Sequence, residues 1–317
     1  MEKAVNKRQK LLVLVLCLLV IFVGLVFVFS QFPDQDFHLV FCDVGQGDAV
    51  LIYQGTSQIL VDGGSAKNSD RLLKCLQKRM PFWDRKIELV INTHPDEDHF
   101  GGLTEIVDRY RVGLFAYNGF DNPESKPFQE LKNNLFESKV CSRKLVAGDV
   151  FRVGEIRFDS LSPRANGESG QKALPKEFFS GKGNCQKPNF EISDQDSNDL
   201  SLVLQVSFGQ FKTLLTGDAP VEIEQLLVWR KQLVPVEVLK LGHHGSKTST
   251  SEEILTASRP QLAVISVGEN SFGHPTKEVL ERLEKFNLKY LRTDQKGDIE
   301  IVSDGTGWSV APPISSF

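Results

Sequence analysis

The chain has 317 residues, 40% of them hydrophobic, which is enough to bury one large core. Its formal net charge is −4. This becomes −7 for residues 31–317, because the first ten residues hold four basic side chains and one acidic side chain. A body of this sign excludes general binding of polyanions through net charge.

A run of apolar residues, 11–29, follows the basic N-terminus. At about 1.5 Å per helical residue it approaches the roughly 30 Å thickness of the hydrocarbon core of a membrane. We therefore predict a basic tail at residues 1–10 and a transmembrane anchor at residues 11–30. Four basic residues precede the anchor and no Lys or Arg follows it before Lys67, so the tail is expected in the cytoplasm and the body outside.

A cleaved signal peptide is the competing interpretation of the same segment. The apolar run is longer than the usual core of a signal peptide, and residues 29–33 offer no A-x-A-like cleavage site. A single-pass anchor that is not cleaved is therefore favoured.

The body begins with three predicted strands, at residues 37–41, 49–53 and 58–61, joined by turns that contain glycine. A carboxylate pair flanks the first turn, and Asp62 ends the third strand. Carboxylates in turns usually accept hydrogen bonds from backbone N–H groups, so a structural role is expected for Asp48 and Asp62. An amphipathic helix at residues 69–79 is predicted to cover the sheet.

The next strand, residues 88–92, leads into the turn T-H-P-D-E-D-H at residues 93–99. This turn holds four potential metal ligands within six residues, and a Gly-Gly pair at 101–102 is expected to open a helix after it. The ligands are His94, Asp96, Asp98 and His99. Imidazole and carboxylate groups supply the nitrogen and oxygen donors that Zn²⁺ or Mn²⁺ accepts. A solvated polar turn is the alternative, and further potential ligands later in the chain argue against it.

A long loop insertion is predicted at residues 162–197, which are rich in Gly, Ser, Asn, Pro and Lys. It follows strands at 112–116, 149–153 and 156–160 and a helix near 128–136. Its aromatic and basic side chains suit stacking on bases and contact with phosphates, whereas a plain surface insertion is the alternative. These side chains are Phe178, Phe179, Phe190, Lys172, Lys176, Lys182 and Lys187.

Two strands in the second half end in potential ligands. One ends at Asp218, and the other, residues 236–241, ends in G-H-H-G-S at 242–246. Adjacent histidines point apart, so one of His243 and His244 is expected to bind metal while the other contacts substrate or orients the site. The remaining predicted elements are helices at 220–231 and 277–286 and strands at 262–266, 290–293, 299–302 and 308–310.

The five cysteines, Cys17, Cys42, Cys75, Cys141 and Cys185, are an odd number without a C-x-x-C pair. Cys17 lies in the apolar segment and Cys42 in a predicted core strand. The spacing argues against a disulfide framework and against a thiolate zinc site, and it leaves open one bridge among the other three cysteines.

The turn at 93–99 resembles the His-x-His-x-Asp-His signature of the metallo-β-lactamase superfamily, with Asp at the second His position. D-V-G-Q-G-D at 43–48, L-T-G-D at 215–218, G-H-H-G-S at 242–246 and F-G-H-P at 272–275 follow the same order as in the hydrolase domain of the ComEC/Rec2 competence proteins. The resemblance covers about residues 37–309. It implies an α/β fold, a four-layer αββα sandwich, with one hydrolase domain at residues 37–311.

The resemblance also implies two divalent metal ions and a role for each motif residue. The implied metal ligands are His94, Asp96, Asp98, His99, His243 and Asp218, with Asp218 as the bridge. Asp98, His244 and His274 are expected to be catalytic, and Asp43, Gln46, Asn198, Ser201 and Lys247 to contact substrate. The usual third histidine is missing, because no His lies between His99 and His243. Oxygen donors must fill its place, which suits Mn²⁺ at least as well as Zn²⁺.

The leading functional hypothesis is a membrane-anchored, metal-dependent phosphodiesterase that cleaves DNA outside the cytoplasmic membrane. ComEC-like proteins carry many membrane spans and one is predicted here, so a channel would come from separate DNA-uptake proteins. The first alternative is a hydrolase of an envelope phosphate ester of the teichoic-acid or phosphocholine type. The second is a non-catalytic, membrane-tethered module that binds metal.

Overall fold

The computed structural model describes residues 2–30, 32–164 and 190–314. The chain divides into two compact units, residues 1–34 and residues 35–317, which are described separately.

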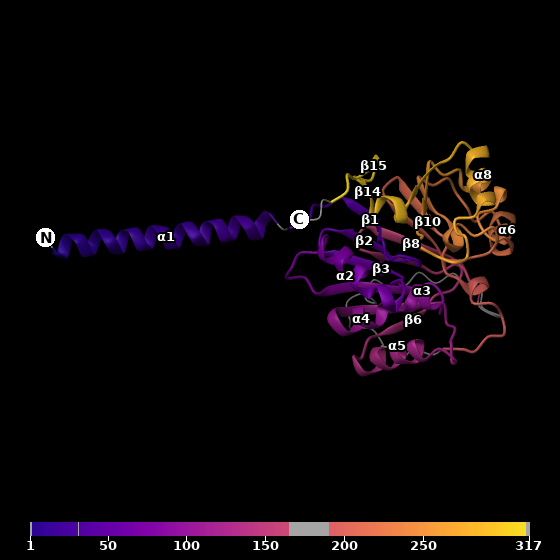
Figure 1. The fold of residues 1–317 in the computed structure, drawn as a ribbon, viewed down its shortest axis with the longest axis horizontal. Helices are drawn as coiled ribbons and strands as arrows, with labels where there is room; N and C mark the ends of the chain where they lie inside the picture. The colour runs from indigo at the N-terminus through magenta and orange to yellow at the C-terminus, as the bar shows by residue number, and fades with distance from the viewer. Residues whose placement is uncertain (1, 31, 165–189, 315–317) are drawn as a thin grey trace. The chain divides into compact units, whose positions relative to one another are not determined.

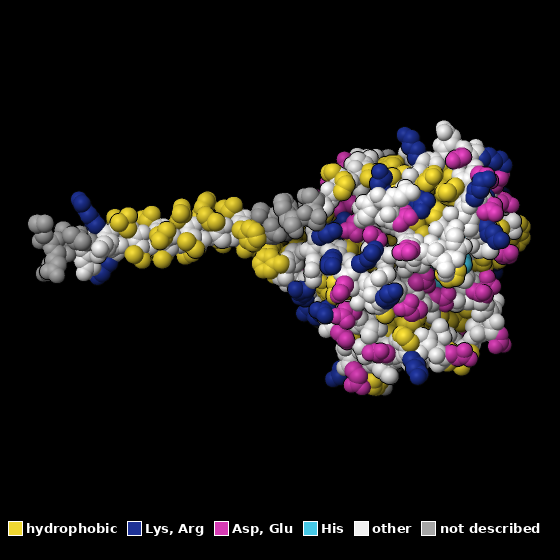
Figure 2. Space-filling view, viewed as in Figure 1, with side chains coloured by type: hydrophobic (Ala, Val, Ile, Leu, Met, Phe, Trp, Pro, Cys, Tyr) yellow, Lys and Arg dark blue, Asp and Glu magenta, His cyan; other side chains and the backbone are white. Residues whose placement is uncertain are grey.

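The first unit is the helix α1 (Glu2–Ser30). Its apolar side chains are exposed along its length, and Figure 2 shows them covering its surface. The segment Asn6–Val28 is long and apolar enough to cross a membrane, a test that signal sequences also pass. The structure thus contains the single apolar N-terminal helix that the sequence predicts.

The second unit contains two β-sheets, as Figure 1 shows. The strand order of the first sheet is β15-β14-β1-β2-β3-β4-β5-β6. Its strands are β1 (Phe37–Phe41), β2 (Val50–Gln54), β3 (Ser57–Val61), β4 (Lys86–Asn92), β5 (Arg111–Tyr117), β6 (Ser142–Lys144), β14 (Ile299–Ser303) and β15 (Trp308–Val310). The order of the second sheet is β13-β12-β11-β10-β9-β8-β7. Its strands are β7 (Val150–Val153), β8 (Ile156–Ser162), β9 (Val203–Phe208), β10 (Phe211–Leu215), β11 (Val238–Lys240), β12 (Leu262–Ile265) and β13 (Lys289–Arg292).

The main core lies between the two sheets, where Phe37 and Ile91 of the first sheet join Phe158 and Val206 of the second in one buried cluster. Alternation along the strands sends the other apolar residues to the outer faces, which helices cover. The first sheet packs against α2 (Ser69–Gln77), α4 (Leu103–Arg109) and α5 (Lys126–Glu137). The second packs against α6 (Val221–Trp229), α7 (Glu252–Ser258) and α8 (Lys277–Lys285). The predicted helix–sheet–sheet–helix sandwich is confirmed.

Strand direction brings the motif residues of each half to one edge of its sheet. Strands β3, β4 and β5 are parallel, so Asp62 after β3 and the turn after β4 lie at their shared carboxyl ends. Strands β10, β11 and β12 are parallel as well, and Asp218 and the His-His pair follow β10 and β11. Loops at such carboxyl ends are the usual place for a site in a sheet of this kind.

The helix predicted after Gly101-Gly102 is α4, which begins at Leu103 and buries Leu103, Ile106 and Val107. Three local features differ from the prediction. The short helix α3 (Glu97–Phe100), which precedes the glycine pair, was not predicted. The short strand β6 was missed, since three residues carry no readable period. The strand predicted at 290–293 ends one residue earlier, where the short helix α9 (Thr293–Lys296) begins.

The expectation drawn from the cysteines was wrong. Cys42, just after β1, forms a disulfide with Cys75 on the buried face of α2, with a Cα–Cα distance of 5.8 Å. Cys141 is disulfide-bonded as well. The sequence separation of 33 residues between Cys42 and Cys75 does not by itself indicate a disulfide. Only the packing of α2 on the sheet brings the two side chains together.

Most of the predicted loop insertion lies outside the described residues. This part is residues 165–189, with Phe178, Phe179 and the four lysines. Phe190 is described, and its ring lies 4.5 Å from that of Tyr117 and 5.4 Å from that of Phe128. Phe190 therefore packs against the outer core, which corrects its predicted role in stacking on bases.

Candidate metal centre

Asp62 organises the turn that follows β4. Its carboxylate accepts hydrogen bonds from the Thr93 backbone N–H at 2.8 Å, the Thr93 hydroxyl at 2.6 Å and His99 Nδ1 at 2.9 Å. A bond from Nδ1–H leaves the Nε2 lone pair of His99 free to bind a metal. Asp62 thus has the structural role that the sequence predicts and also orients a potential ligand.

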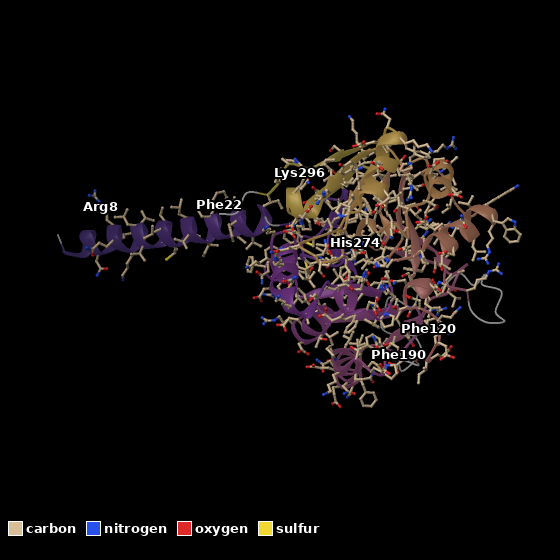
Figure 3. The ribbon with its side chains drawn as sticks, turned by 45° about the vertical axis from the view of Figure 1, so that its right-hand side comes forward. Arg8, Phe22, Phe120, Phe190, His274 and Lys296 are labelled. Atoms are coloured by element: carbon tan, nitrogen blue, oxygen red, sulfur yellow. A yellow bond between two sulfur atoms is a disulfide. The ribbon has the colours of Figure 1, made fainter. Side chains whose placement is uncertain are left out.

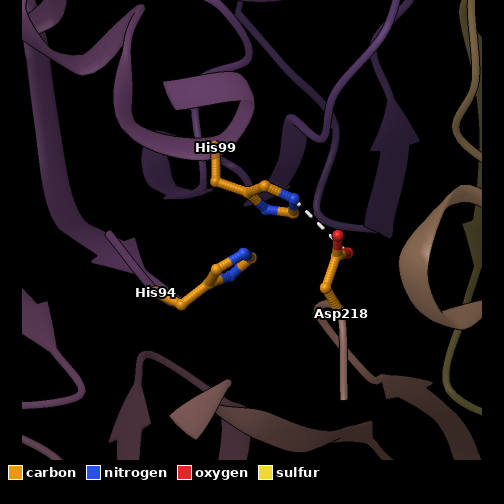
Figure 4. A group of neighbouring side chains, drawn as sticks. All are labelled: His94, His99 and Asp218. Atoms are coloured by element: carbon orange, nitrogen blue, oxygen red, sulfur yellow. Dashed lines mark ion pairs between the residues drawn. The ribbon is translucent and has the colours of Figure 1, made fainter. Parts of the chain in front are cut away.

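The potential ligands of the two halves meet in one buried cluster. His99 Nε2 lies 3.3 Å from Asp218 Oδ1, and His244 Nε2 lies 3.4 Å from Asp218 Oδ2 and 3.2 Å from Asp98 Oδ2. Figure 4 shows the rings of His94 and His99 turned towards Asp218. Asp218 therefore stands between the two halves, where the sequence predicts a bridging carboxylate.

The cluster has the properties of a metal site. Nε2 of His94, His99 and His244 and Oδ1 of Asp218 are buried, and none has a hydrogen-bond partner among the described residues. Buried polar atoms without partners are costly unless another group binds them. Ligand atoms of His94, His99 and Asp218 lie within 4.8 Å of one another, as do those of Asp98, His99 and His244. These nitrogen and oxygen donors fit Zn²⁺ or Mn²⁺.

The structure places His244, and not His243, within this cluster. Both residues have positive φ, 48° for His243 and 54° for His244, so the chain turns sharply after β11. His244 Nδ1–H donates to the Ser266 carbonyl at 2.9 Å, which directs Nε2 at the carboxylates. The His243 side chain is 29% exposed, and its Nε2 is 3.8 Å from Asp218. The expectation that His243 is the ligand of the pair followed from the resemblance, in which the ligand comes directly after a strand-terminal Gly, whereas this turn directs the next residue, His244, into the cluster.

Asp96 lies at the rim of the cluster, with Oδ2 at 3.5 Å from His94 Nε2 and a side chain that is 34% exposed. Burial would raise the pKa of this carboxyl, but the neighbouring His94 imidazole outweighs burial and the pKa is lowered. Asp96 is therefore ionised at neutral pH and can act as an oxygen donor beside His94.

Sequence reasoning missed Lys240, the last residue of β11. It is 1% exposed, and its ammonium contacts Asp48 and the Gly217 carbonyl and lies 3.6 Å from Asp218 Oδ1. Asp48 Oδ1 in turn lies 3.4 Å from His244 Nδ1. A lysine within an otherwise apolar strand could have signalled this contact, because a buried ammonium needs a carboxylate partner.

The carboxylates control the protonation of the buried histidines. Burial disfavours the charged imidazolium of His244, but the Asp218 and Asp48 carboxylates outweigh this and raise the pKa of His244 to about 10. Asp218 and Asp62 likewise raise the pKa of His99 well above its usual value, against the effect of burial. The pKa of Asp218 is held well below its usual range, because His244 and His99 outweigh burial.

Metal binding is consequently expected to release protons. At pH 7 the raised pKa values keep His99 and His244 protonated in the metal-free protein, and a ligand nitrogen must lose its proton to bind a cation. Titration with Mn²⁺ in buffers of different ionisation enthalpy should show release of about two protons at pH 7, with affinity rising as pH rises. His244→Ala should remove about one of these protons, and a binding enthalpy independent of the buffer would contradict the prediction.

Three of the predicted substrate and catalytic residues, Asp43, Gln46 and His274, lie near the cluster or line a cavity that reaches it. Asp43 and Gln46 line a cavity of about 820 Å³ that reaches Asp98. Lys247 is exposed in the loop after the His-His pair. The His274 ring centroid is 5.5 Å from that of His243, and His274 Nδ1 is buried without a hydrogen-bond partner among the described residues.

The two remaining predicted substrate residues lie in or next to η3 (Asn198–Leu200). The Ser201 hydroxyl accepts a hydrogen bond from the Asp218 backbone N–H at 3.2 Å, so Ser201 positions the loop of Asp218. Asn198 Oδ1 is buried without a hydrogen-bond partner among the described residues. Ser201 therefore supports the potential metal ligand Asp218, and the side-chain oxygen of Asn198 can accept a hydrogen bond from another group.

Comparison with known proteins agrees with this geometry. The model of the metallo-beta-lactamase superfamily matches residues 42–165. The chain is 29% identical over 297 residues to ComE operon protein 3 of Bacillus subtilis, which covers 86% of this chain and 34% of that protein. It is 27% identical over 270 residues to competence protein ComA of Neisseria gonorrhoeae, covering 84% of this chain and 32% of that protein. The chain thus spans about a third of the length of these relatives.

A solved structure shows the same fold at low sequence identity. The metallo-beta-lactamase fold protein YhfI of Bacillus subtilis superposes with a TM-score of 0.53 and 12% identity, over 84% of this chain and 100% of that one. Motifs, fold and matched relatives agree. The chain therefore contains a match to the metallo-beta-lactamase superfamily over residues 42–165, has the fold of that superfamily and is related in sequence to competence proteins.

Proposed function

We propose that this protein is a metal-dependent phosphodiesterase that cleaves DNA at the outer side of the cytoplasmic membrane. The observation that carries the proposal is the meeting of unpartnered Nε2 atoms from His94, His99 and His244 with the carboxylates of Asp98 and Asp218. Relatedness to competence proteins supports DNA as the substrate.

The geometry supports one division of the ligands between two ions. His94 and Asp96 would hold one ion, Asp98, His99 and His244 the other, and Asp218 would reach both. When bound, two divalent cations lower the pKa of a water molecule and neutralise charge on a phosphoryl group.

The remaining polar residues hold these ligands and meet the substrate. Asp62, the Ser266 carbonyl and Asp48 fix the orientation of the two buried imidazoles. Burial and the nearby His243 and His244 lower the pKa of His274, so its imidazole is neutral at pH 7. A neutral His274 can donate one N–H bond to an oxygen of the phosphodiester.

Two independent features support a site outside the cytoplasm. The apolar span of α1 has its Lys and Arg residues on the N-terminal side, which favours an outward-facing body. The Cys42–Cys75 disulfide and the bonded state of Cys141 fit an oxidising compartment, because cytosolic thiols are kept reduced. On this proposal, DNA would pass the membrane through separate channel or uptake proteins.

The charge of the cavity beside Asp98 favours a second candidate function. Five carboxylates line it, against the two cationic side chains Lys67 and Arg71. The acidic residues are Asp43, Glu97, Asp98, Glu269 and Asp294. A phosphate ester that also carries a positive group, such as phosphocholine, would be attracted by this surplus of carboxylates. A phosphodiester backbone without a positive group would not.

One assay separates the candidates. The full chain in detergent, loaded with Mn²⁺ or Zn²⁺, is incubated with single-stranded DNA, double-stranded DNA and glycerophosphocholine. We expect hydrolysis of DNA that stops when EDTA removes the metal. Hydrolysis of glycerophosphocholine alone would replace the DNA proposal by the second candidate. Metal binding without turnover of any substrate would make the protein a non-catalytic binding module.

A further inference from the structure

We infer that Phe272 forms a nucleobase subsite, on which one base of a single-stranded substrate stacks while its phosphodiester lies at the metal centre. This inference rests on the proposed function and names a part of the substrate that the ligand cluster does not contact. Phe272 lines the cavity that reaches Asp98, yet its side chain is 71% exposed.

The loop that carries Phe272 is held in one conformation by Asn270. The Asn270 amide nitrogen donates to the carbonyls of Gly268 at 2.8 Å and His274 at 2.9 Å. Its oxygen accepts from the backbone N–H groups of Phe272 at 3.1 Å and His274 at 3.0 Å. Four hydrogen bonds from one side chain preorganise the loop, so an exposed ring there is presented at low cost in conformational entropy.

A row of three rings connects Phe272 to the ligand cluster. The centroids of Phe272 and His274 are 5.7 Å apart with planes inclined by 26°, and those of His274 and His243 are 5.5 Å apart at 76°. His243 Nε2 is 3.8 Å from Asp218. Figure 3 labels His274 in the middle of the body, where the purple first half meets the orange and yellow second half. Phe272 is therefore linked through two ring contacts to the ligand cluster, where the phosphodiester would lie.

The charges around the cavity leave room for a phosphodiester strand. Asp43 is bonded to Arg71 at 3.0 Å, and Asp294 is bonded to Arg292 at 2.6 Å. Glu97 accepts hydrogen bonds from the Ala66 backbone N–H and the Ser65 hydroxyl. Three of the five carboxylates thus have partners outside the ligand cluster, and Asp98, which meets His244 within the cluster, would be neutralised by a bound cation.

The chemistry of the Phe272 side chain indicates the ligand. A phenyl ring has no hydrogen-bonding atom, so it recognises a flat ring face and tolerates every base. Bases in a duplex are stacked on each other and hidden, which restricts this contact to single strands and frayed ends. Stacking on one aromatic side chain contributes about 1–3 kcal/mol per base, or about 5- to 150-fold in binding.

The test compares a base-bearing single strand with an abasic strand of the same length. The full chain in detergent with Mn²⁺ is used, and kcat/KM and the Kd from fluorescence anisotropy are measured for both strands. We expect the native protein to favour the base-bearing strand about 5- to 150-fold. In Phe272→Ala this preference should disappear while the values for the abasic strand stay unchanged, and Phe272→Trp should restore it.

Trp229→Ala is the matched control, because Trp229 on α6 is 78% exposed and does not line the cavity. This variant should keep the native preference. Equal loss on both strands in Phe272→Ala would assign the ring a purely structural role and overturn the inference, as would an unchanged preference. If the native protein cleaves neither strand but binds the base-bearing one more tightly through Phe272, the subsite stands and the nuclease proposal fails. If it cleaves both strands equally well, the nuclease proposal stands and the subsite inference fails.

Discussion

Asp98→Ala is expected to lower DNA hydrolysis more than about 100-fold while leaving the fold intact. Loss of a residue that only orients a metal ligand already costs about 10- to 100-fold, and the proposal makes Asp98 a direct ligand. Its side chain is 33% exposed and meets His244 Nε2 at 3.2 Å, so few folding contacts depend on it. The measurements are kcat/KM on single-stranded DNA with Mn²⁺ and the thermal midpoint of the metal-free protein.

Glu105→Gln is the control for this change, because Glu105 lies on the surface of α4 and pairs with Arg109 within the same helix. It removes one carboxylate from a nearby element without touching the cluster, and its activity should stay within about twofold of the native value. Native activity in Asp98→Ala would show that the metal centre has been assigned to the wrong residues. Unfolding of the variant would instead show that Asp98 is needed for stability.

Lys240→Met is expected to destabilise the metal-free protein by about 3–5 kcal/mol. The Lys240 ammonium is buried against Asp48 and near Asp218, so its removal takes away one of the cations that balance these two buried carboxylates. Burial disfavours the charged form of Lys240, but Asp48 and Asp218 outweigh burial and raise its pKa, so the group is charged at neutral pH. Thermal unfolding in EDTA should show a midpoint at least about 6 °C below that of the native protein.

A double variant separates the charge effect from simple loss of packing. In Lys240→Met/Asp48→Asn both partners of the contact are neutral, so part of the lost stability should return. Lys247→Met is the matched control, since this lysine is exposed on the following loop. A midpoint for Lys240→Met equal to that of Lys247→Met would rule out a stabilising role for the buried ammonium.

Much of the architecture could be predicted from local pattern alone. Short apolar runs bounded by turns marked the strands, and the spacing of Leu72, Leu73 and Leu76 marked α2. The turn at 93–99 could be recognised as a ligand turn because four donors fall within six residues. Asp218 could be assigned with it from the resemblance to the superfamily and from its place at the end of an apolar strand.

The features that sequence reasoning missed depend on contacts between distant segments. The Cys42–Cys75 bridge requires α2 to pack across β1, and no spacing rule encodes that packing. Lys240 lies in a predicted strand, and only the structure shows that Asp48, just before β2 of the other sheet, is its partner. Phe190 resembled a free aromatic of the loop insertion, yet it packs against Tyr117.

The choice between His243 and His244 shows most clearly which features follow from the sequence and which require the tertiary structure. Sequence by itself determined that a strand ends in a histidine pair, that one member belongs with Asp98 and Asp218, and that glycines on either side allow a sharp turn. Only the tertiary structure decided which member it is. Both histidines have positive φ, and the Ser266 carbonyl of the neighbouring strand end binds Nδ1 of His244. A hydrogen bond from a residue 22 positions away determines where the other nitrogen points, and local pattern carries no information about it.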